Sequence, residues 1–334
     1  MIKKSFLTCC FAVLCFFVFC SCSQSCSLAE KNKSGQVSVK VLNWNLETFF
    51  DGNFDGNEYD EFKNSSAGWS SSKYDERLER LSTLIKTVDA DIVIMEELEK
   101  EEQLYDIYNR LCSNFNLSRN YSYGCFTKSE GSSIGIGIIS RFPLKNVKTF
   151  SLDIRTEGKL QPEMRPIMTA EVTVKEKDLT LAVNHWKSKS GGQEETELWR
   201  NYQEKLLAEI VQECYAKGQC VLAAGDFNRD IVEFKRISGK TSIFNVALMG
   251  NEEVNVYSPW YKENGELYVP GSYYFNGSWE RIDHFFAGRS VTIQDFKVEK
   301  NGEWASPEGF PLRYSVKYGK GWSDHFPVSC TVVW

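Results

Sequence analysis

The 334-residue sequence has little positive charge, few histidines and no zinc-type cysteine spacing. Its 45 acidic residues outnumber 39 lysines and arginines, which gives a net charge of −6 at pH 7. A chain with this balance has no overall electrostatic attraction for nucleic acid, so cleaving nucleic acid would need a local basic site or a bound cation. The absence of a CxxC pair, with only three histidines present, argues against a Cys/His zinc site.

The N-terminal apolar run is too short to span a membrane comfortably. It extends from Phe6 to Phe19, about 14 residues against the roughly 20 that a span needs, and follows two lysines. The run ends in Phe19-Cys20-Ser21-Cys22, which resembles a relaxed bacterial lipobox, although Phe19 stands where Leu or Val is usual. We therefore expect a lipoprotein-type signal peptide over residues 1–22, with Cys22 lipidated. A plain secretory signal and an uncleaved anchor are the alternatives.

Residues 23–36 are polar and are expected to form a tether. A diacylated cysteine ahead of this tether carries at least two acyl chains, which is enough for stable anchoring. We therefore expect an exported, membrane-anchored lipoprotein, periplasmic or at the cell surface, and a monomer.

Cysteines are scarce beyond the signal segment. Six of the 11 lie in the first 26 residues, and the others are Cys112, Cys125, Cys214, Cys220 and Cys330. Export would permit disulfides. Cys214 and Cys220 are the only close pair, and two free thiols are an equal alternative.

Residues 37–334 show no internal repeat and no break in composition, which indicates one catalytic domain. Helical spacing marks three segments, and short apolar or alternating runs mark about ten strands. Several strands follow one another without a helix between them, which argues against a doubly wound parallel sheet. We expect an α+β fold of two packed mixed sheets with helices outside. The expected helices cover 76–88, 99–112 and 193–216, and the clearest strands cover 37–44, 91–95, 133–140, 167–174, 179–185, 220–225, 282–286, 291–298 and 326–333.

Polar side chains cluster at the ends of six apolar strands. A single carboxylate in such a place is usually just solvated, but six ends rich in Asp, Glu, Asn and His indicate a site. Oxygen donors of this kind suit Mg²⁺, Mn²⁺ or Ca²⁺ better than zinc. The residues are Asn45, Glu96, Glu97, Asn184, His185, Asp226, Asn228, Asp283, Asp324 and His325.

These strand ends carry recognisable motifs, which appear in order along the chain. Together they resemble the successive motifs of the endonuclease/exonuclease/phosphatase superfamily, and the retained His185 is closer to pancreatic-type deoxyribonucleases than to abasic-site repair enzymes. The resemblance implies a four-layer α/β/β/α sandwich with the site at one edge of both sheets. The motifs are LNWNLETF from Leu42, DIVIMEE from Asp91, GIISRFP from Gly137, VNH from Val183, GDFN from Gly225, RIDH from Arg281 and SDHFPV from Ser323.

The resemblance also implies a metal site, with Mg²⁺ as the expected ion and Mn²⁺ or Ca²⁺ as alternatives. Glu97 would be the principal ligand, with Asn45 and Asp324 nearby. Asn45 would also contact the substrate. Arg165, in Met-Arg-Pro-Ile, falls where the deoxyribonucleases place an arginine that contacts a phosphate.

By the same resemblance, five residues would act on the phosphate. Asp226 and Asn228 would orient the attacking water and the phosphate. His185 would touch the phosphate and assist the leaving oxygen, and His325 would pair with Asp283. An Asp–His pair raises the basicity of the histidine and fixes its tautomer. Asp226 and His325 both remain candidates for the general base.

Three departures from the pattern stand out. Residues 120–126 supply no carboxylate where deoxyribonucleases place the glutamate that supports the first histidine, so His185 lacks an evident partner. Glu96 replaces the more usual glutamine and is expected to face solvent. His284 adjoins Asp283 on a strand, so its side chain points to the opposite face and is expected to be structural.

Two further segments each have more than one interpretation. Asp51-Gly-Asn-Phe-Asp-Gly56 matches the first half of a calcium loop, but its twelfth position is Phe62 and no helix precedes it, so we expect a solvated acidic loop. The aromatic residues of 257–279 could stack on bases, face sugars or lipid, or pack on the sheet.

The sequence therefore predicts a metal-dependent phosphoesterase that hydrolyses phosphodiesters, with a nonspecific nuclease as the leading interpretation. The alternative is a lipid head-group or small-molecule enzyme of the sphingomyelinase or inositol-phosphate type. A catalytically silent surface-binding protein on the same scaffold is a third possibility, but it would have no need of an intact metal and histidine set.

Overall fold

The computed structural model describes residues 35–63, 66–115, 120–156, 158–237 and 243–334. The expected signal peptide, Cys22 and most of the tether lie outside these residues. Among the described helices, none is long and apolar enough to cross a membrane. The five cysteines that the structure describes are all free thiols, so Cys214 and Cys220 do not pair.

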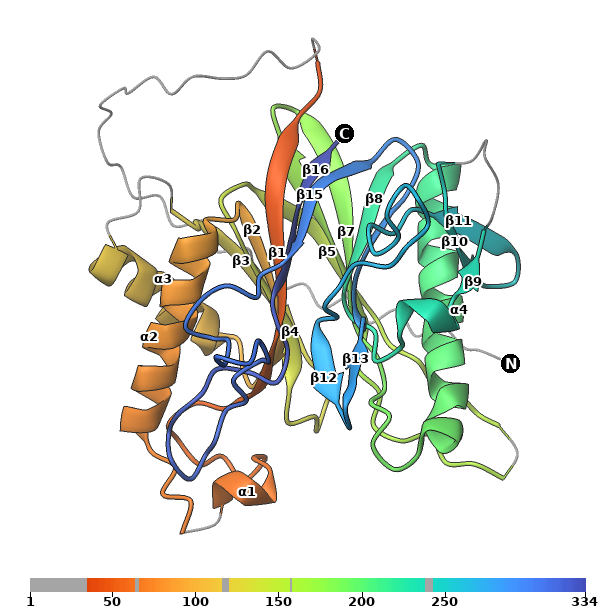
Figure 1. The fold of residues 1–334 in the computed structure, drawn as a ribbon. Coiled ribbons are helices and arrows are strands. Elements are labelled where there is room, and N and C mark those ends of the chain that lie inside the picture. Colours follow the sequence, from red (N-terminus) through yellow and green to blue (C-terminus); the bar gives the residue numbers. More distant parts are fainter. Residues whose placement is uncertain (1–34, 64–65, 116–119, 157, 238–242) are drawn as a thin grey trace.

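The first sheet has six strands in the order β15-β16-β1-β2-β4-β3 (Figure 1). Only β1 and β2 pair in parallel; the other pairs in this sheet are antiparallel. The bounds are β1 Ser38–Phe49, β2 Ile92–Leu98, β3 Tyr123–Thr127, β4 Gly135–Ser140, β15 Thr292–Val298 and β16 Val328–Val333.

The second sheet has five strands in the order β14-β8-β7-β6-β5. Here β7 and β8 are parallel, and β6 and β7 form an antiparallel hairpin. The bounds are β5 Leu144–Phe150, β6 Ile167–Val174, β7 Lys177–His185, β8 Cys220–Asp226 and β14 Asp283–Ala287.

Helices cover the outer face of each sheet, as Figure 1 shows. Helices α2 (Ser71–Val88) and α3 (Glu102–Phe115) lie on the first sheet, and α4 (Gln193–Ala216) lies on the second. The four-layer α/β/β/α sandwich is therefore confirmed, and so are the bounds expected for α4. Helix α2 begins earlier than expected because Ser70 caps it, with its side chain accepting a hydrogen bond from the Lys73 amide.

Smaller elements complete the described chain. They are α1 Asp60–Lys63, the 3₁₀ turn η1 Ile231–Glu233, the sheet of β9 Lys235–Arg236, β10 Val246–Met249 and β11 Glu253–Val256, and the hairpin of β12 Tyr273–Phe275 and β13 Ser278–Glu280.

Side-chain alternation along β1 shows how the layers pack. Val39 and Val41 join the apolar cluster between the sheets, whereas Leu42 and Trp44 join the cluster beneath α2 and α3. Burying each large apolar side chain contributes roughly 1.5–3 kcal/mol to folding. Toward the end of β1 the inward-facing position is taken by Asn45, where the apolar core gives way to polar groups.

Candidate active site

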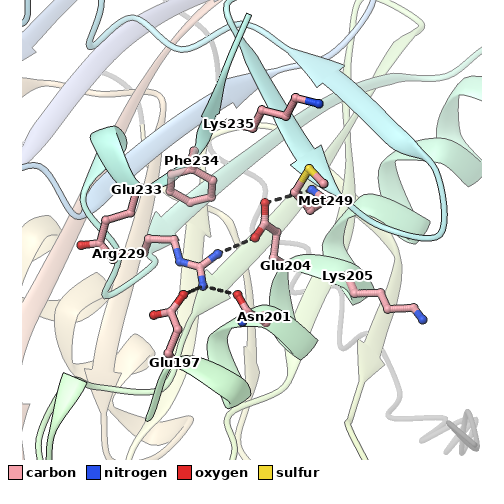
Figure 2. A pocket seen from close by; sticks show the side chains of 9 residues that line it. All are labelled: Glu197, Asn201, Glu204, Lys205, Arg229, Glu233, Phe234, Lys235 and Met249. Atoms are coloured by element: carbon pink, nitrogen blue, oxygen red, sulfur yellow. Dashed lines mark hydrogen bonds and ion pairs between the residues drawn. The ribbon is translucent and has the colours of Figure 1, made fainter. Parts of the chain in front are cut away.

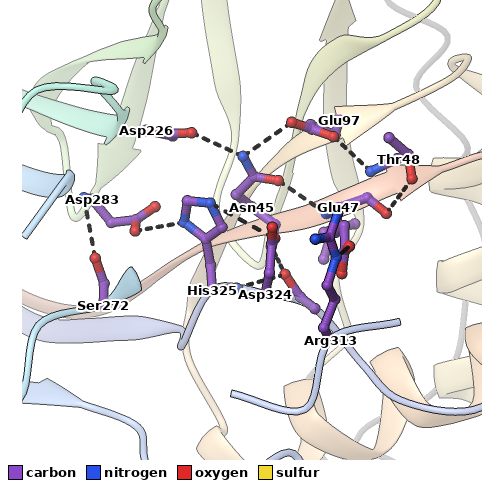
Figure 3. A network of polar contacts seen from close by, with 12 residues as sticks. Asn45, Glu47, Thr48, Glu97, Asp226, Ser272, Asp283, Arg313, Asp324 and His325 are labelled. Atoms are coloured by element: carbon purple, nitrogen blue, oxygen red, sulfur yellow. Dashed lines mark hydrogen bonds and ion pairs between the residues drawn. The ribbon is translucent and has the colours of Figure 1, made fainter. Parts of the chain in front are cut away.

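Strand register brings the predicted residues to one edge of both sheets. His185 at the end of β7 and Asp283 at the start of β14 each pair with Asp226 at the end of β8. In the facing sheet, Asn45 on β1 pairs with Glu96, next to Glu97. Figure 3 shows side chains from both sheets converging at this edge.

A single amide group bridges the two sheets. Asn45 Nδ2 donates to Asp226 Oδ2 at 2.9 Å and to Glu97 Oε1 at 3.2 Å, while Asn45 Oδ1 accepts from the Glu47 amide at 2.9 Å. Both the nitrogen and the oxygen of the Asn45 amide are therefore hydrogen-bonded. The carboxylates of Glu97 and Asp226 are held on either side of its nitrogen.

Glu97 reaches the site because β2 is irregular there. The pairing register shifts between Glu96 and Leu98, and Glu97 adopts φ 68°, a left-handed conformation that is costly for a residue with a side chain. This bulge aims the carboxylate outward, where Oε2 accepts from the Thr48 amide at 2.6 Å. Glu97 is therefore held by backbone geometry as well as by hydrogen bonds.

Asp226 is buried and fully hydrogen-bonded. Its Oδ1 accepts from the Asn228 amide at 2.8 Å and its Oδ2 from Asn228 Nδ2 at 3.0 Å. Burial raises the pKa of Asp226 to about 7; Asp283 adds to this effect, and His325 opposes it. Asn228 lies in the tight turn after β8 and has a left-handed backbone conformation, with φ 46°.

His185 lies between two carboxylates. Its Nε2 is 3.6 Å from Glu97 Oε1 and 3.7 Å from Asp226 Oδ2, and its Nδ1 has no hydrogen-bond partner in the described chain. Residues 120–126 indeed supply no carboxylate to it. Burial, followed by the positive charges of Arg165 and His325, holds the pKa of His185 well below its usual range.

His325 pairs with Asp283, as the resemblance implied. Nδ1 of His325 lies 2.9 Å from Asp283 Oδ2, so its Nε2 faces the site, 3.9 Å from Asp324 Oδ1. Burial alone would lower the pKa of His325, but the carboxylates of Asp283, Asp324 and Asp226 together raise it well above its usual range.

The donor set fits a divalent cation with a mostly hydrated shell. No three Asp, Glu, His or Cys side chains of the described residues gather about one point. Magnesium, however, commonly uses only one or two carboxylates and completes its shell with water and substrate oxygens. Glu97 and Asp324 are both partly exposed, and the charge of Glu97 adds to burial in raising the pKa of Asp324, opposed by His325. A cation would relieve this repulsion.

Arg165 lies beside His185. Its Nη1 donates to the Trp186 carbonyl at 3.3 Å, and its charge lowers the pKa of His185. No motif in the sequence pointed to Tyr59, which lies within reach of the charges of Arg165 and Glu97. Burial raises the pKa of Tyr59, whereas Arg165 lowers it.

The expectation that Glu96 faces solvent was wrong. Its side chain is 0% exposed, and both carboxylate oxygens lack a hydrogen-bond partner in the part of the chain that the structure describes. Glu96 shares the inward face of β2 with Ile92 and Ile94, because alternate residues of a strand point the same way. Burial, with the charges of Asp283 and Asp226, raises the pKa of Glu96 well above its usual range.

His284 takes the structural place that was expected. Its Nε2 lies 2.8 Å from the Arg229 carbonyl oxygen, and its ring contacts Phe227, Phe234 and Phe286. Burial lowers the pKa of His284 to about 4. The ring therefore sits in an aromatic cluster behind the site.

The aromatic segment divides into packing and exposed parts. Trp260 is fully buried, and its indole nitrogen donates to the Asp283 carbonyl at 2.9 Å. Tyr273 lies against the His325 ring, with centroids 4.7 Å apart, and stacks on Phe275 at 6.1 Å. Phe275 is 53% exposed, so this pair leads from the site to the surface.

A cavity of ≈ 450 Å³ is lined by residues of α4, of the segment that follows β8 and of β10. Figure 2 shows Arg229 in it, bonded to Glu197, Glu204 and Asn201. These partners satisfy the terminal nitrogens of the guanidinium. The network therefore anchors the chain that follows Asp226, and none of the predicted catalytic residues lines the cavity.

The acidic loop already holds a positive charge. Lys100 Nζ lies 2.7 Å from Asp51 Oδ2 and 2.7 Å from Asp55 Oδ2. The ammonium is therefore placed between two of the carboxylates that a calcium ion would use.

Comparison with known proteins assigns the family. Residues 40–333 match the model of the Endonuclease/Exonuclease/phosphatase family. No curated protein matches the chain.

Three solved structures share the fold. Truncated Caenorhabditis elegans TDP2 is 17% identical, with 88% of this chain and 97% of that one covered at a TM-score of 0.53. A family protein from Bacteroides thetaiotaomicron is 16% identical (90% and 98% covered, TM-score 0.52). The human Nocturnin catalytic domain with bound sulfate is 16% identical (89% and 96% covered, TM-score 0.51). The chain belongs to the endonuclease/exonuclease/phosphatase family and is a phosphoric ester hydrolase, in a family whose members typically depend on a divalent metal ion.

Proposed function

We propose that the protein is a metal-dependent phosphodiesterase that acts as a nonspecific nuclease. The observation that carries this proposal is the convergence of Asn45, Glu97 and Asp226 with the Asp283–His325 pair at one edge of the sandwich. Hydrolysis of a phosphodiester requires donors for the phosphate oxygens and an acceptor for the proton of water, and this cluster offers both.

Glu97 and Asp324 would hold the cation, and Mg²⁺ suits their carboxylate oxygens. Asn45 would join them as a ligand only with its amide turned round, because its Nδ2 points toward Glu97 and Asp226. When bound, the ion would neutralise charge that develops on the phosphate oxygens. Asn228 keeps Asp226 oriented through its two hydrogen bonds.

His325 and His185 both present Nε2 to the site. Asp283 fixes the ring of His325, so that its Nε2 can donate to a phosphate oxygen. Asp226, whose pKa burial raises to about 7, is the group suited to accept the proton of the attacking water. The raised pKa of His325 keeps its ring protonated at neutral pH, so it acts as a donor.

The exposed aromatic pair supports nucleic acid as the substrate. Tyr273 and Phe275 stack on each other and extend from His325 toward solvent. Every base has a flat π face, so such a pair binds single strands of any sequence. Inositol phosphates offer no such face, and a choline head group would contact the pair only through its quaternary ammonium.

A hydrolysis panel tests the proposal directly. Plasmid DNA, RNA, sphingomyelin, inositol phosphates and bis(p-nitrophenyl) phosphate would each be assayed with Mg²⁺ and with EDTA. Metal-dependent cleavage of DNA or RNA is expected. Turnover of sphingomyelin or inositol phosphates alone would replace the nuclease with the alternative.

A matched pair of variants tests the stacking role. Phe275→Ala should lower kcat/KM for a single-stranded oligonucleotide by about 10-fold, because stacking contributes ~1–3 kcal/mol per base. Tyr105→Ala on α3 is the control, since its ring is 52% exposed against 53% for Phe275. Equal effects of the two variants would remove the aromatic pair from the argument.

We also propose that the chain is exported and lipidated at Cys22. The support is the short apolar run that ends in a cysteine preceded by a small residue. Mass spectrometry of the mature N-terminus would show a diacylated Cys22. An unmodified N-terminus at another residue would rule lipidation out.

A further inference from the structure

Arg313 stands at the rim of the site, on the long segment between β15 and β16. Its side chain is 70% exposed, unlike the buried histidines and Asp226. In Figure 3 its guanidinium lies beside Glu47, and Asp324 lies between it and His325 in this view.

Glu47 fixes the orientation of this arginine. Arg313 Nε donates to Glu47 Oε1 at 2.5 Å, and the amide of the next residue, Tyr314, donates to Glu47 Oε2 at 2.9 Å. Neither terminal nitrogen of Arg313 has a hydrogen-bond acceptor among the described residues. Glu47 therefore holds Nε of Arg313, while the two terminal nitrogens face solvent. This arrangement favours the binding of an anion, because the arginine side chain has little conformational freedom left to lose.

Arg313 and Arg165 act on different groups of the site. Arg313 lowers the pKa of Glu47 and of Asp324, although burial raises both, Glu47 to about 7. Arg165 instead acts on His185 and Tyr59. One guanidinium can serve the phosphate that is hydrolysed, and the other is then available to a different anionic group.

We propose that Arg313 binds a second phosphate of the substrate, next to the one that is hydrolysed. Guanidinium groups pair with phosphates through two parallel hydrogen bonds, and the outer edge of Arg313 offers such donors. A nucleic-acid strand, with one phosphate per nucleotide, supplies this partner. A choline head group has a cation beside its phosphate, and Arg313 would repel it.

This inference rests on the proposed function, so the test uses substrates that separate the two. Arg313→Gln would be assayed on a single-stranded oligonucleotide and on bis(p-nitrophenyl) phosphate, which has only the scissile phosphate. We expect about a 10-fold rise in KM for the oligonucleotide and at most about a 2-fold change for the small diester.

Binding gives a readout that a merely structural role would not change. In a Glu97→Gln background, oligonucleotide affinity would be measured against salt concentration by fluorescence anisotropy. Loss of one phosphate contact should reduce the slope of log K against log salt by about 0.7. Arg313→Lys, which keeps the charge but not the Nε bond to Glu47, should retain most of the slope.

Arg289→Gln is the matched control, because it removes the same charge from a residue beyond the far end of β14. It should leave every substrate unaffected. If nucleic acid is neither cleaved nor bound but Arg313→Gln weakens binding of inositol hexakisphosphate, the nuclease proposal fails and the second-phosphate site stands. Two results would overturn the proposed role of Arg313: an equal loss of activity on all substrates in Arg313→Gln, or a salt slope unchanged by this variant for every polyanion. Arg313 would then serve only to hold its own segment to Glu47.

Discussion

Nδ1 of His325 and Oδ2 of Asp283 lie 2.9 Å apart, although Asp283 belongs to the second sheet and His325 leads into a strand of the first. Asp283 begins β14 of the second sheet, whereas His325 precedes β16 of the first. The pair therefore forms only when the sandwich is complete, and it joins the layers at the point where the site opens. Because both side chains are buried, the bond is poorly screened by solvent.

The pair should act as one unit in catalysis. His325→Ala and Asp283→Asn are each expected to lower kcat by ~10²–10⁴-fold, since a positioned acid or base contributes that much. The double variant should lose little more than either single variant. Turnover and melting temperature would be measured on the same four proteins. Additive kinetic effects would break the pairing, and a lower Tm with modest kinetic change would mean that the pair only holds the sheets together.

Glu97 should be indispensable for metal-dependent turnover. Glu97→Gln keeps the shape of the side chain and its contact with the Thr48 amide but removes the charge, so activity should fall by several orders of magnitude with little change in Tm. EDTA should have the same effect on the wild type. Glu176→Gln, at the β6–β7 turn and at the opposite end of β7 from His185, is the control. Full activity in EDTA would contradict the proposed chemistry.

The sequence was sufficient to predict the site residues that lie at the ends of apolar strands. His185, Asp226 and Asp283 each end or begin an apolar strand, and Asn45 follows the apolar part of β1. Strand register then places them together. Helix α4 was predicted with its observed bounds, because its long polar–apolar repeat leaves little choice.

Residues placed by loops could not be predicted in this way. Tyr59 and Arg313 reach the site from irregular segments, whose paths depend on tertiary contacts such as Glu47 with Arg313. Glu96 was misassigned for another reason. A carboxylate is rarely buried without a partner, so solvent was the reasonable expectation, but strand alternation determined where it points.

Replacing Glu96 by glutamine should therefore stabilise the protein. A carboxyl whose folded-state pKa is raised opposes folding once the pH exceeds its unfolded pKa of about 4.3. Glu96→Gln should raise the free energy of unfolding at pH 7 by about 1–3 kcal/mol, and the gain should shrink toward pH 4. Melting curves in EDTA would check this without interference from a metal at Glu97. A destabilised variant at pH 7 would mean that buried water or an ion satisfies the carboxylate.

His284 should make the fold sensitive to mild acid. Its pKa is about 4 in the folded protein against about 6.5 when unfolded, so the unfolded chain binds more protons between these values. This group should reduce stability by up to ~1.4 kcal/mol per pH unit as the pH falls from 6.5 to 4. His284→Gln keeps a donor for the Arg229 carbonyl and should flatten that part of the Tm profile. Parallel profiles for variant and wild type would show that His284 does not titrate there.

The acidic loop should not bind calcium tightly, because Lys100 already neutralises it. Burial tends to lower the pKa of Lys100, but its hydrogen bonds to Asp51 and Asp55 outweigh burial and raise it, so the ammonium stays charged. A calcium ion would have to displace this group, and Phe62 offers no carboxylate at the twelfth position. Calorimetry on Glu97→Gln, which separates the loop from the catalytic site, should show no micromolar calcium site. Lys100→Met should lower Tm, because Asp51 and Asp55 would then repel each other. A micromolar site in Glu97→Gln that disappears with Asp51→Ala would show instead that the loop is a calcium site and that Lys100 moves aside for the ion.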